Sequence, residues 1–150
     1  MQRIKLEIEK LGVLGENDND QSINYFEVFF DTVDNNTKVK NSNMILKLIV
    51  EGAYSEDDES GALSKLNAIF NWSKEKTSPT NYRTVKVEIF DQTVEKPNRS
   101  YEFPDMFVLD YHEIYVVDEE KGSTIKFRLE LNQKAGSGLE KTNSMLLSTK

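Results

Sequence analysis

Residues 125–133, IKFRLELNQ, contain the pattern that decides the fold. Apolar and charged side chains alternate along this stretch, with the apolar ones at Ile125, Phe127, Leu129 and Leu131. A period of two puts neighbouring side chains on opposite faces of a β-strand, so that one face is buried and the other meets water. We therefore predict a half-buried strand that ends near residue 133.

Other segments show the same alternation of apolar and charged side chains or contain a higher share of apolar residues. Alternation recurs at residues 3–9, 25–31 and 84–90. Residues 44–51 are almost continuously apolar, and residues 106–117 are dense in aromatic and branched side chains. Such segments are typical of strands when polar turns bound them, as residues 96–99 and 118–122 do here. Pro104 cannot donate a hydrogen bond to a ladder, so it predicts a strand start, an edge or a kink.

One segment has the period of a helix. Apolar side chains recur at three- and four-residue spacing over residues 60–76, at Leu63, Leu66, Ile69 and Phe70. The acidic run at residues 56–59 lacks the ligand spacing and glycine position of a calcium loop, so we interpret it as a solvated helix entry.

These elements predict a mainly β fold, either a small closed antiparallel β-barrel or a sandwich, with one flanking α-helix and six or seven strands. We expect a single domain over residues 1–134 and a flexible C-terminal tail over residues 135–150, which begins with glycine and serine. Aromatic side chains on the faces opposite the core suggest sheet surface that another subunit covers: Tyr25, Phe29, Phe90 and Tyr115.

Composition excludes several classes of function. The 150 residues carry a net charge of −7 and include no cysteine and a single histidine. An acidic chain repels nucleic acid and anionic lipid, and the missing residues remove thiolate metal sites and cysteine nucleophiles. No apolar run approaches the ~20 residues of a membrane helix, and the charged N-terminal segment is unlike a signal peptide.

Catalytic patterns are weak. His112 lies inside a predicted strand, where a lone histidine is more often a surface residue than a base. Asp110 with Glu113, or Asp57 with Asp58, would have to face each other across a cleft to act as a carboxylate pair. Trp72 could line a carbohydrate or peptide groove but fits the core better. We predict no enzyme activity and no catalytic, cofactor-binding or metal-binding residue.

Three segments resemble a known family. YRTVKVEI (82–89), RSYEFPDMFVLDY (99–111) and FRLELNQK (127–134) are similar to the second half of the haemolysin-coregulated protein and phage tail-tube group. In that group an aromatic strand end and a short turn precede an apolar strand with Asp-Tyr, an acidic hairpin containing glycine and a final alternating strand. The order of elements matches over about residues 1–134.

The resemblance implies a structural subunit of a phage-tail-like or type VI secretion-like contractile injection system. Such subunits form rings, commonly hexameric, that stack into a tube, with sheath, spike and baseplate proteins as partners and no contact with membrane or specific nucleic-acid sequence. Assembly would begin in the cytoplasm, and the particle could be released or secreted. Residues 32–43 would form either a loop that reaches the adjacent ring or a plain surface hairpin.

Two other interpretations of the function stay open. The acidic balance is compatible with a β-sandwich binding module or an immunity-type protein that lacks catalysis and binds a basic toxin or a glycan. The other interpretation is a hydrolase that uses Asp110 or Glu113.

Overall fold

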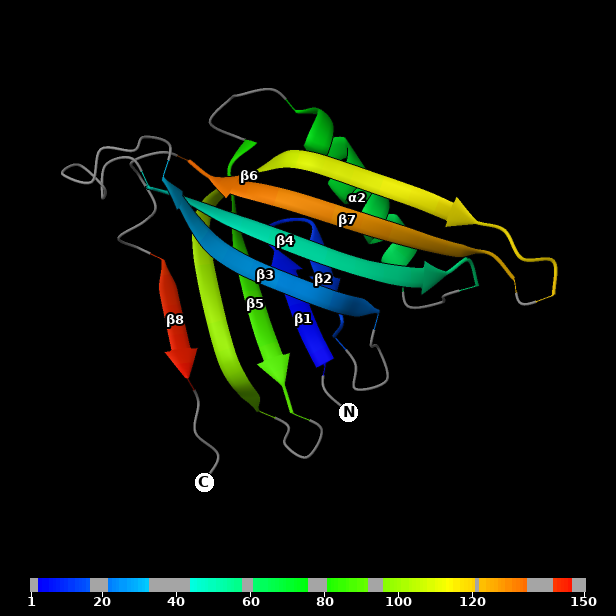
Figure 1. Cartoon of the computed structure of the whole chain (residues 1–150), viewed down its shortest axis with the longest axis horizontal. Helices are drawn as coiled ribbons and strands as arrows, with labels where there is room; N and C mark the ends of the chain where they lie inside the picture. The colour runs from blue at the N-terminus through cyan, green and yellow to red at the C-terminus, as the bar shows by residue number, and fades with distance from the viewer. Residues whose placement is uncertain are drawn as a thin grey trace.

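Eight strands and one helix make up the described part of the chain, residues 3–16, 22–32, 44–57, 61–75, 81–91, 96–120, 122–134 and 142–146 of a computed structural model (Figure 1). In chain order they are β1 (Arg3–Ile8), β2 (Gly12–Leu14), β3 (Ile23–Thr32), β4 (Met44–Ser55), α2 (Ala62–Lys74), β5 (Arg83–Phe90), β6 (Pro97–Val116), β7 (Thr124–Gln133) and β8 (Asn143–Leu146).

One antiparallel sheet runs in the order β2-β1-β5-β6-β7-β4-β3, and β8 pairs with β6 outside this path. The long strand β6 belongs to two layers. Its residues 97–106 pair with β5 in the back layer, which also contains β1, β2 and β8, while residues 106–116 pair with β7 in the front layer, which continues to β4 and β3. Among the described residues β2 and β3 do not pair, so the sheet is open and the sandwich form of the prediction describes it better than a closed barrel.

β6 changes layer next to Pro104, which confirms the predicted kink. Asp105 has a positive φ of 57°, a conformation that side-chain-bearing residues rarely adopt outside turns. Two hydrogen bonds hold the bend: the Lys134 N–H donates to the Asp105 carbonyl over 2.8 Å, and Gln133 Nε2 donates to the Pro104 carbonyl over 2.9 Å.

The core lies between the two layers and consists of the apolar halves of the alternating strands. Val85, Val87, Leu129 and Leu131 are fully buried, as their period predicts. Gly52 is needed between β3 and β7 in the front layer, because an added Cβ would lie 2.5 Å from the Ser22 carbonyl oxygen and 2.7 Å from the Phe127 ring.

The helix confirms the expectation for residues 60–76. α2 packs against β6 and β2 and buries Ala62, Leu66, Ile69 and Trp72 in the same core cluster. Gly61 precedes it with a φ of 85°, and its first turn contains no acidic residue. Glu56 and Asp57 lie exposed ahead of the helix, and the rest of the acidic run lies outside the described residues.

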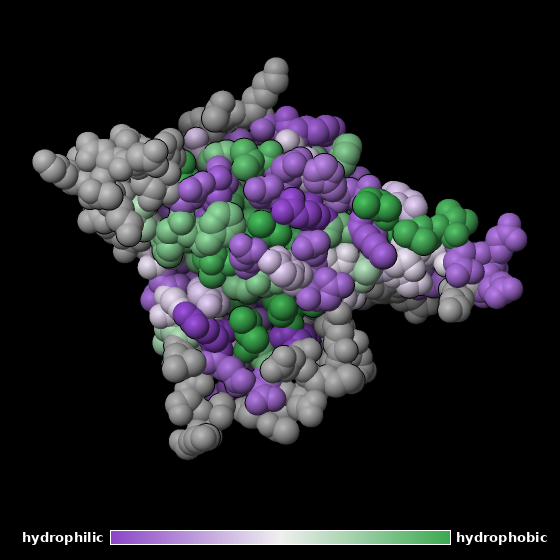
Figure 2. Space-filling model, in the orientation of Figure 1, coloured by the Kyte–Doolittle hydropathy of each residue, from purple (hydrophilic) through white to green (hydrophobic). Residues whose placement is uncertain are grey.

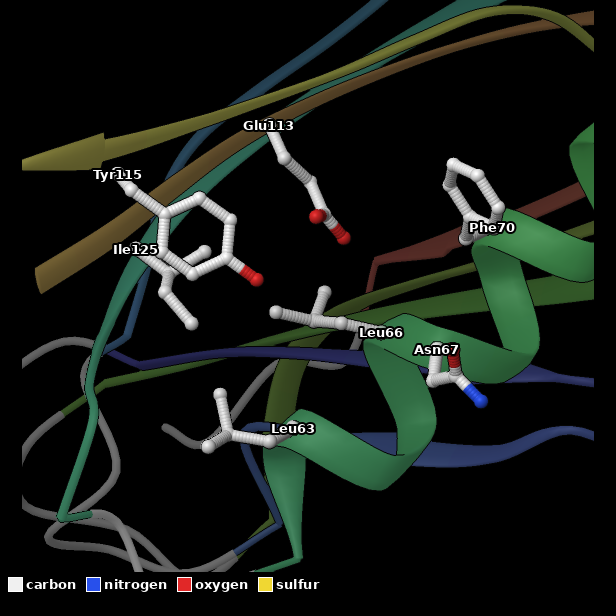
Figure 3. Close-up of a pocket in the computed structure, with 7 residues that line it drawn as sticks. All are labelled: Leu63, Leu66, Asn67, Phe70, Glu113, Tyr115 and Ile125. Atoms are coloured by element: carbon white, nitrogen blue, oxygen red, sulfur yellow. The ribbon is translucent and has the colours of Figure 1, made fainter.

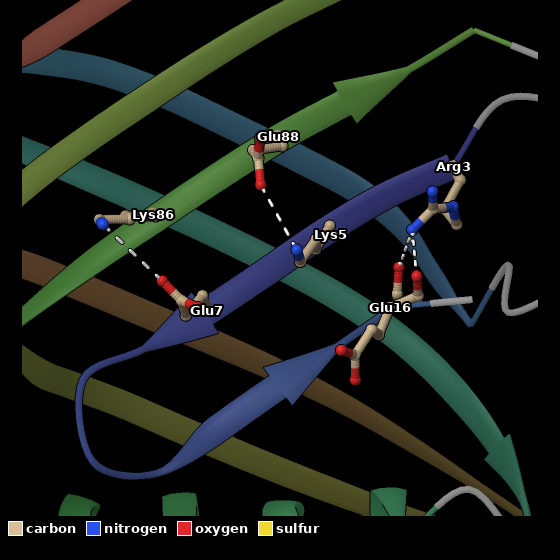
Figure 4. Close-up of polar contacts among 7 residues, drawn as sticks. Arg3, Lys5, Glu7, Glu16, Lys86 and Glu88 are labelled. Carbon is tan, nitrogen blue, oxygen red and sulfur yellow. Dashed lines mark hydrogen bonds and ion pairs between the residues drawn. The ribbon is translucent and has the colours of Figure 1, made fainter. Parts of the chain in front are cut away.

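The outer face of the back layer carries the charges that alternate with the core residues of β1 and β5. Lys5 lies opposite Glu88 and Glu7 lies opposite Lys86, with ion-pair distances of 3.6 and 4.0 Å (Figure 4). Directly opposed unlike charges stabilise such a strand pair modestly, which fits a face that meets water.

Arg3 connects β1 to the segment that follows β2. Its guanidinium donates to the carbonyls of Gly15 and Glu16, both over 2.7 Å (Figure 4). It also lies 4.0 Å from the centroid of the Phe90 ring, and that ring is only 8% exposed. The prediction that another subunit covers Phe90 is therefore wrong, because this chain covers the ring itself.

Two strands were not expected from the sequence. β2 is only three residues long, and β8 lies inside the predicted tail, where it pairs with β6 between Arg99 and Glu102. The domain limit at residue 134 and the flexibility of the tail both stay predictions. The proposed loop at residues 32–43 lies outside the described residues apart from the end of β3.

Candidate assembly surface

The residues considered for catalysis do not converge. His112 Nε2 lies 2.9 Å from Asp110 Oδ2 on the outer face of β6, where both side chains are exposed. Glu113 lies on the opposite face of the strand and accepts a 2.7 Å hydrogen bond from the Tyr111 hydroxyl. Asp110 and Glu113 therefore point away from each other, as expected for strand residues separated by an odd number of positions.

A groove of about 260 Å³ lies between α2 and β6. Glu113 and Tyr115 point into it from β6, and apolar side chains of the helix form the other wall (Figure 3). Its lining residues are Leu63, Leu66, Asn67, Phe70, Glu113, Tyr115 and Ile125. One carboxylate stands alone among them, whereas general acid–base chemistry on a glycoside needs two.

Burial and the hydrogen bond to Glu113 raise the pKa of the Tyr111 hydroxyl above its ordinary value, with burial the larger cause. Tyr111 also packs against the core cluster. A phenol that stays protonated and donates to a neighbouring carboxylate holds that carboxylate in place at neutral pH. The hydrogen bond joins two side chains on the helix-facing side of β6.

Trp72 is part of the core and lines no groove. It is 1% exposed, and its Nε1–H donates to the Asn81 carbonyl over 2.7 Å. In the parts of the chain that the structure describes, no group of three His, Cys, Asp or Glu side chains is placed to hold a metal ion. Asp57 lies exposed in a turn, and Asp58 lies outside the described residues. Within the same residues no helix is long and apolar enough to span a membrane.

The front layer has two long unpaired edges, one on each side. Within the described residues β3 pairs only with β4, and residues 107–116 of β6 pair only with β7. Both edges present backbone N–H and C=O groups that a further strand could satisfy. The edges of the back layer are shorter, since β2 has three residues and β8 has four.

Exposed apolar side chains gather on these two edges. Tyr25 and Phe30 on β3 are 42% and 53% exposed, and Ile114 and Tyr115 on β6 are 60% and 64% exposed. The apolar run continues past β6 to Val117, which is 76% exposed. Large apolar side chains beside open backbone are characteristic of an interaction surface.

The outer face of the front layer, turned away from the core, carries both charged and apolar side chains. Carboxylates and cations alternate across it, at Glu27, Asp31, Lys47, Glu51, Asp110, Lys126, Arg128 and Glu130. Asp31 pairs with Lys47 at 3.2 Å and Arg128 with Glu130 at 3.4 Å. Figure 2 shows hydrophilic and hydrophobic side chains interspersed over this view of the molecule, with an apolar group toward the hairpin between β6 and β7.

The sequence anticipated part of this surface. Tyr25 and Phe29 lie on the outer face of β3, as predicted, although Phe29 is half-buried. Tyr115 is exposed but lies on the helix-facing side of β6, where it lines the groove. Ile114 was missed because charged and apolar side chains do not alternate regularly around it: Glu113 precedes it and three apolar residues follow, so no period assigns a face.

Comparison with known proteins adds evidence about the fold. No protein-family model matches the chain, and no curated protein matches it by sequence. Among solved structures, Hcp1 from Salmonella typhimurium is similar with a TM-score of 0.57 and 10% identity over 97% of this chain and 94% of that one.

Two further structures agree. A type six secretion system protein is similar with a TM-score of 0.56 and 13% identity over 98% of this chain and 96% of that one. A chain of the sheath-tube complex of PVC, an extracellular contractile injection system, has a TM-score of 0.54 and 7% identity over 97% of this chain and 89% of that one. The chain has the fold of the haemolysin-coregulated protein and of the tube proteins of contractile injection systems.

Proposed function

We propose that this protein is a structural subunit that assembles into rings, which stack into the inner tube of a contractile injection system. The observation that carries the proposal is the pair of long open edges, β3 and residues 107–116 of β6, on opposite sides of one four-stranded layer. A surface that is complementary to a different surface of the same molecule forms closed rings when the rotation between copies closes.

The strand directions support a ring. Neighbouring strands in the front layer are antiparallel, so β3 and β6, its first and last strands, run in opposite directions. Rotation about a ring axis preserves strand direction along that axis, and the β3 edge of one copy therefore meets β6 of the next as an antiparallel strand. The front layer then continues around the ring, and its two edges are paired.

The outer face of the front layer fits the wall of a tube. Charged side chains are spread over it and form ion pairs, and they would keep the wall of an aqueous channel wetted. On this proposal its carboxylates repel acidic or nucleic-acid cargo and so keep it from binding the wall. The rings would be hexameric, with sheath, spike and baseplate proteins as further partners, and the subunit would need no catalytic residue. Assembly would take place in the cytoplasm, and residues 135–150 would form a tail outside the domain.

The proposal predicts that substitution of Ile114 by Glu abolishes assembly. Ile114 is exposed and lies opposite Lys126 of β7, so a carboxylate is tolerated in the isolated subunit but not at a closed edge. Sedimentation velocity and electron microscopy should show rings or tubes for the wild type and monomers for Ile114→Glu. The control Asn71→Glu, on the exposed side of α2, should assemble normally.

A wild-type protein that stays monomeric at high concentration in all conditions would contradict the proposal. That result would instead favour the acidic binding or immunity-type module, especially if the monomer forms a tight one-to-one complex with a basic protein.

A further inference from the structure

We infer that β6 of one copy pairs with β3 of the next in a single register, with His112 opposite Glu27 and Ile114 opposite Tyr25 of the second copy. This inference rests on the proposed assembly and adds which residues meet. It follows from the faces, charges and exposure of the two edges.

The faces restrict the choice of register. Directly opposed residues of an antiparallel pair lie on the same face of the sheet. On the outer face, β3 presents its odd-numbered residues from Tyr25 to Asp31, and β6 presents its even-numbered residues from Asp110 to Val116. Phe26 and Val28 of β3 and Tyr111 of β6 pack toward the core instead. Registers can therefore differ only in steps of two residues.

Charge excludes the nearest alternatives. A shift of two residues in one direction puts Glu27 directly opposite Asp110, and a shift of two in the other direction puts Asp31 opposite Asp110. Like charges in directly opposed positions destabilise a strand pair. In the inferred register Asp110 instead faces the apolar side chain of Phe29.

Apolar exposure excludes a shift of four residues. That shift would move Asp31, which forms a 3.2 Å ion pair with Lys47, opposite His112. It would also place Tyr25 beyond the end of β6, with its ring still exposed. A shift of four in the opposite direction carries Glu27 past the irregularity between Val108 and Asp110, where regular pairing is lost.

The inferred register satisfies the exposed groups of both edges. Tyr25, 42% exposed, covers Ile114, 60% exposed, on the outer face. Glu27 meets the imidazole of His112, and the Tyr25 hydroxyl donates a hydrogen bond to Glu27 that orients its carboxylate toward the edge partner. On the helix-facing side Val28 meets Tyr111, so apolar contacts continue on both faces.

The absence of cysteine in the sequence allows a direct test of the register. Ile114→Cys is combined in turn with Tyr25→Cys, Glu27→Cys or Phe29→Cys, which lie on one face and differ by steps of two. Directly opposed positions have Cα atoms about 4.5–5.5 Å apart, within disulfide range, whereas positions two residues away are about 7–8 Å apart. We expect Tyr25→Cys with Ile114→Cys to form a ladder of covalent oligomers on oxidation, and the other two pairs to lack it.

The outcomes separate the register from the assembly. Rings that crosslink through Glu27→Cys or Phe29→Cys, or through none of the three, would overturn the register while the proposed function stands. Dimers from Ile114→Cys or Tyr25→Cys alone would reveal two-fold edge pairing and would also overturn it. A protein with neither rings nor crosslinks contradicts the proposed function itself.

A charge exchange tests the same contact without cysteine. His112→Glu should cause loss of rings, because it places a carboxylate opposite Glu27 of the next copy. Adding Glu27→Lys should restore them. Failure of the double variant to restore rings, while its monomer unfolds at the same denaturant concentration as the wild type, would count against the register.

Discussion

Tyr111 shows how a single side chain can belong to the core and to a surface at once. Its ring packs against the buried cluster, while its hydroxyl donates to Glu113 at the edge of the groove beside α2. The phenol is held protonated because burial and the nearby carboxylate both disfavour the phenolate. The ring of Tyr111 therefore holds this half of β6 against the core.

This contact predicts a loss of stability in alkali. The pKa of Tyr111 is raised in the folded state, whereas an unfolded tyrosine ionises near about 10. The unfolded chain therefore loses its proton first, and the contribution of Tyr111 to stability, complete below pH ~10, disappears as pH rises above that value. Urea unfolding from pH 8 to pH ~11 should show a shallower decline for Tyr111→Phe than for the wild type.

At neutral pH the same substitution should cost about 0.5–1.5 kcal/mol, because one hydrogen bond is lost. Glu113→Gln keeps a hydrogen-bond acceptor but removes the charge. The decline of its unfolding free energy between pH 8 and pH ~11 should therefore be steeper than that of Tyr111→Phe and shallower than that of the wild type. Equal slopes for all three proteins would contradict the assigned role of Tyr111.

At the scale of elements, Trp72, near the C-terminal end of α2, joins the helix to the sheet. Trp72 combines apolar burial with a hydrogen bond to the Asn81 carbonyl, close to where β5 begins. Arg83, at the start of β5, lies over the Trp72 ring and 3.8 Å from Glu75, just past the helix. The end of the helix and the beginning of the back layer therefore form one unit.

We predict that Trp72→Phe destabilises the subunit by about 1–3 kcal/mol, since it leaves the buried Asn81 carbonyl without the indole donor. Urea unfolding followed by far-ultraviolet circular dichroism measures this, because Trp72 is the sole tryptophan and its fluorescence is lost. Phe70→Leu, at a site 46% exposed on the same helix, should change stability by less than about 0.5 kcal/mol. Similar effects at both positions would argue against Trp72 as the anchor.

At the scale of the whole molecule, net charge opposes the proposed assembly while the edges favour it. Each copy carries a charge of −7, so copies repel one another across a ring. The inferred contact between His112 and Glu27 of the next copy lies on a face that meets solvent, and such an ion pair is worth at most about 1 kcal/mol. Repulsion among whole subunits should therefore dominate the response to salt.

Raising the ionic strength from ~0.01 M to ~0.15 M shortens the screening length from about 30 Å to about 8 Å. We expect the assembled fraction of the wild type to rise over this range in sedimentation velocity, and Ile114→Glu to stay monomeric throughout. Rings that dissociate as salt is added would show that ion pairs, and not apolar contacts and backbone pairing, hold the copies together.

Local periodicity in the sequence determined the strands around residues 3–9, 25–31, 84–90 and 125–133 and the helix near residues 60–76. It could do so because burial of one face repeats with the geometry of each element. Composition likewise argued against thiolate and histidine chemistry without any knowledge of the fold. Three short segments were enough to indicate the fold group.

Tertiary structure alone decided which strands were left with open edges. The bend at Asp105, the pairing of β8 with β6 and the cover that Arg3 places over Phe90 join residues far apart in the chain, and periodicity within one segment contains no information about such partners. Short strands such as β2 also lack a repeat long enough to detect. The face on which Ile114 lies became known only from its pairing with β7, because the sequence around it does not alternate regularly and the side-chain direction then depends on the neighbouring strand.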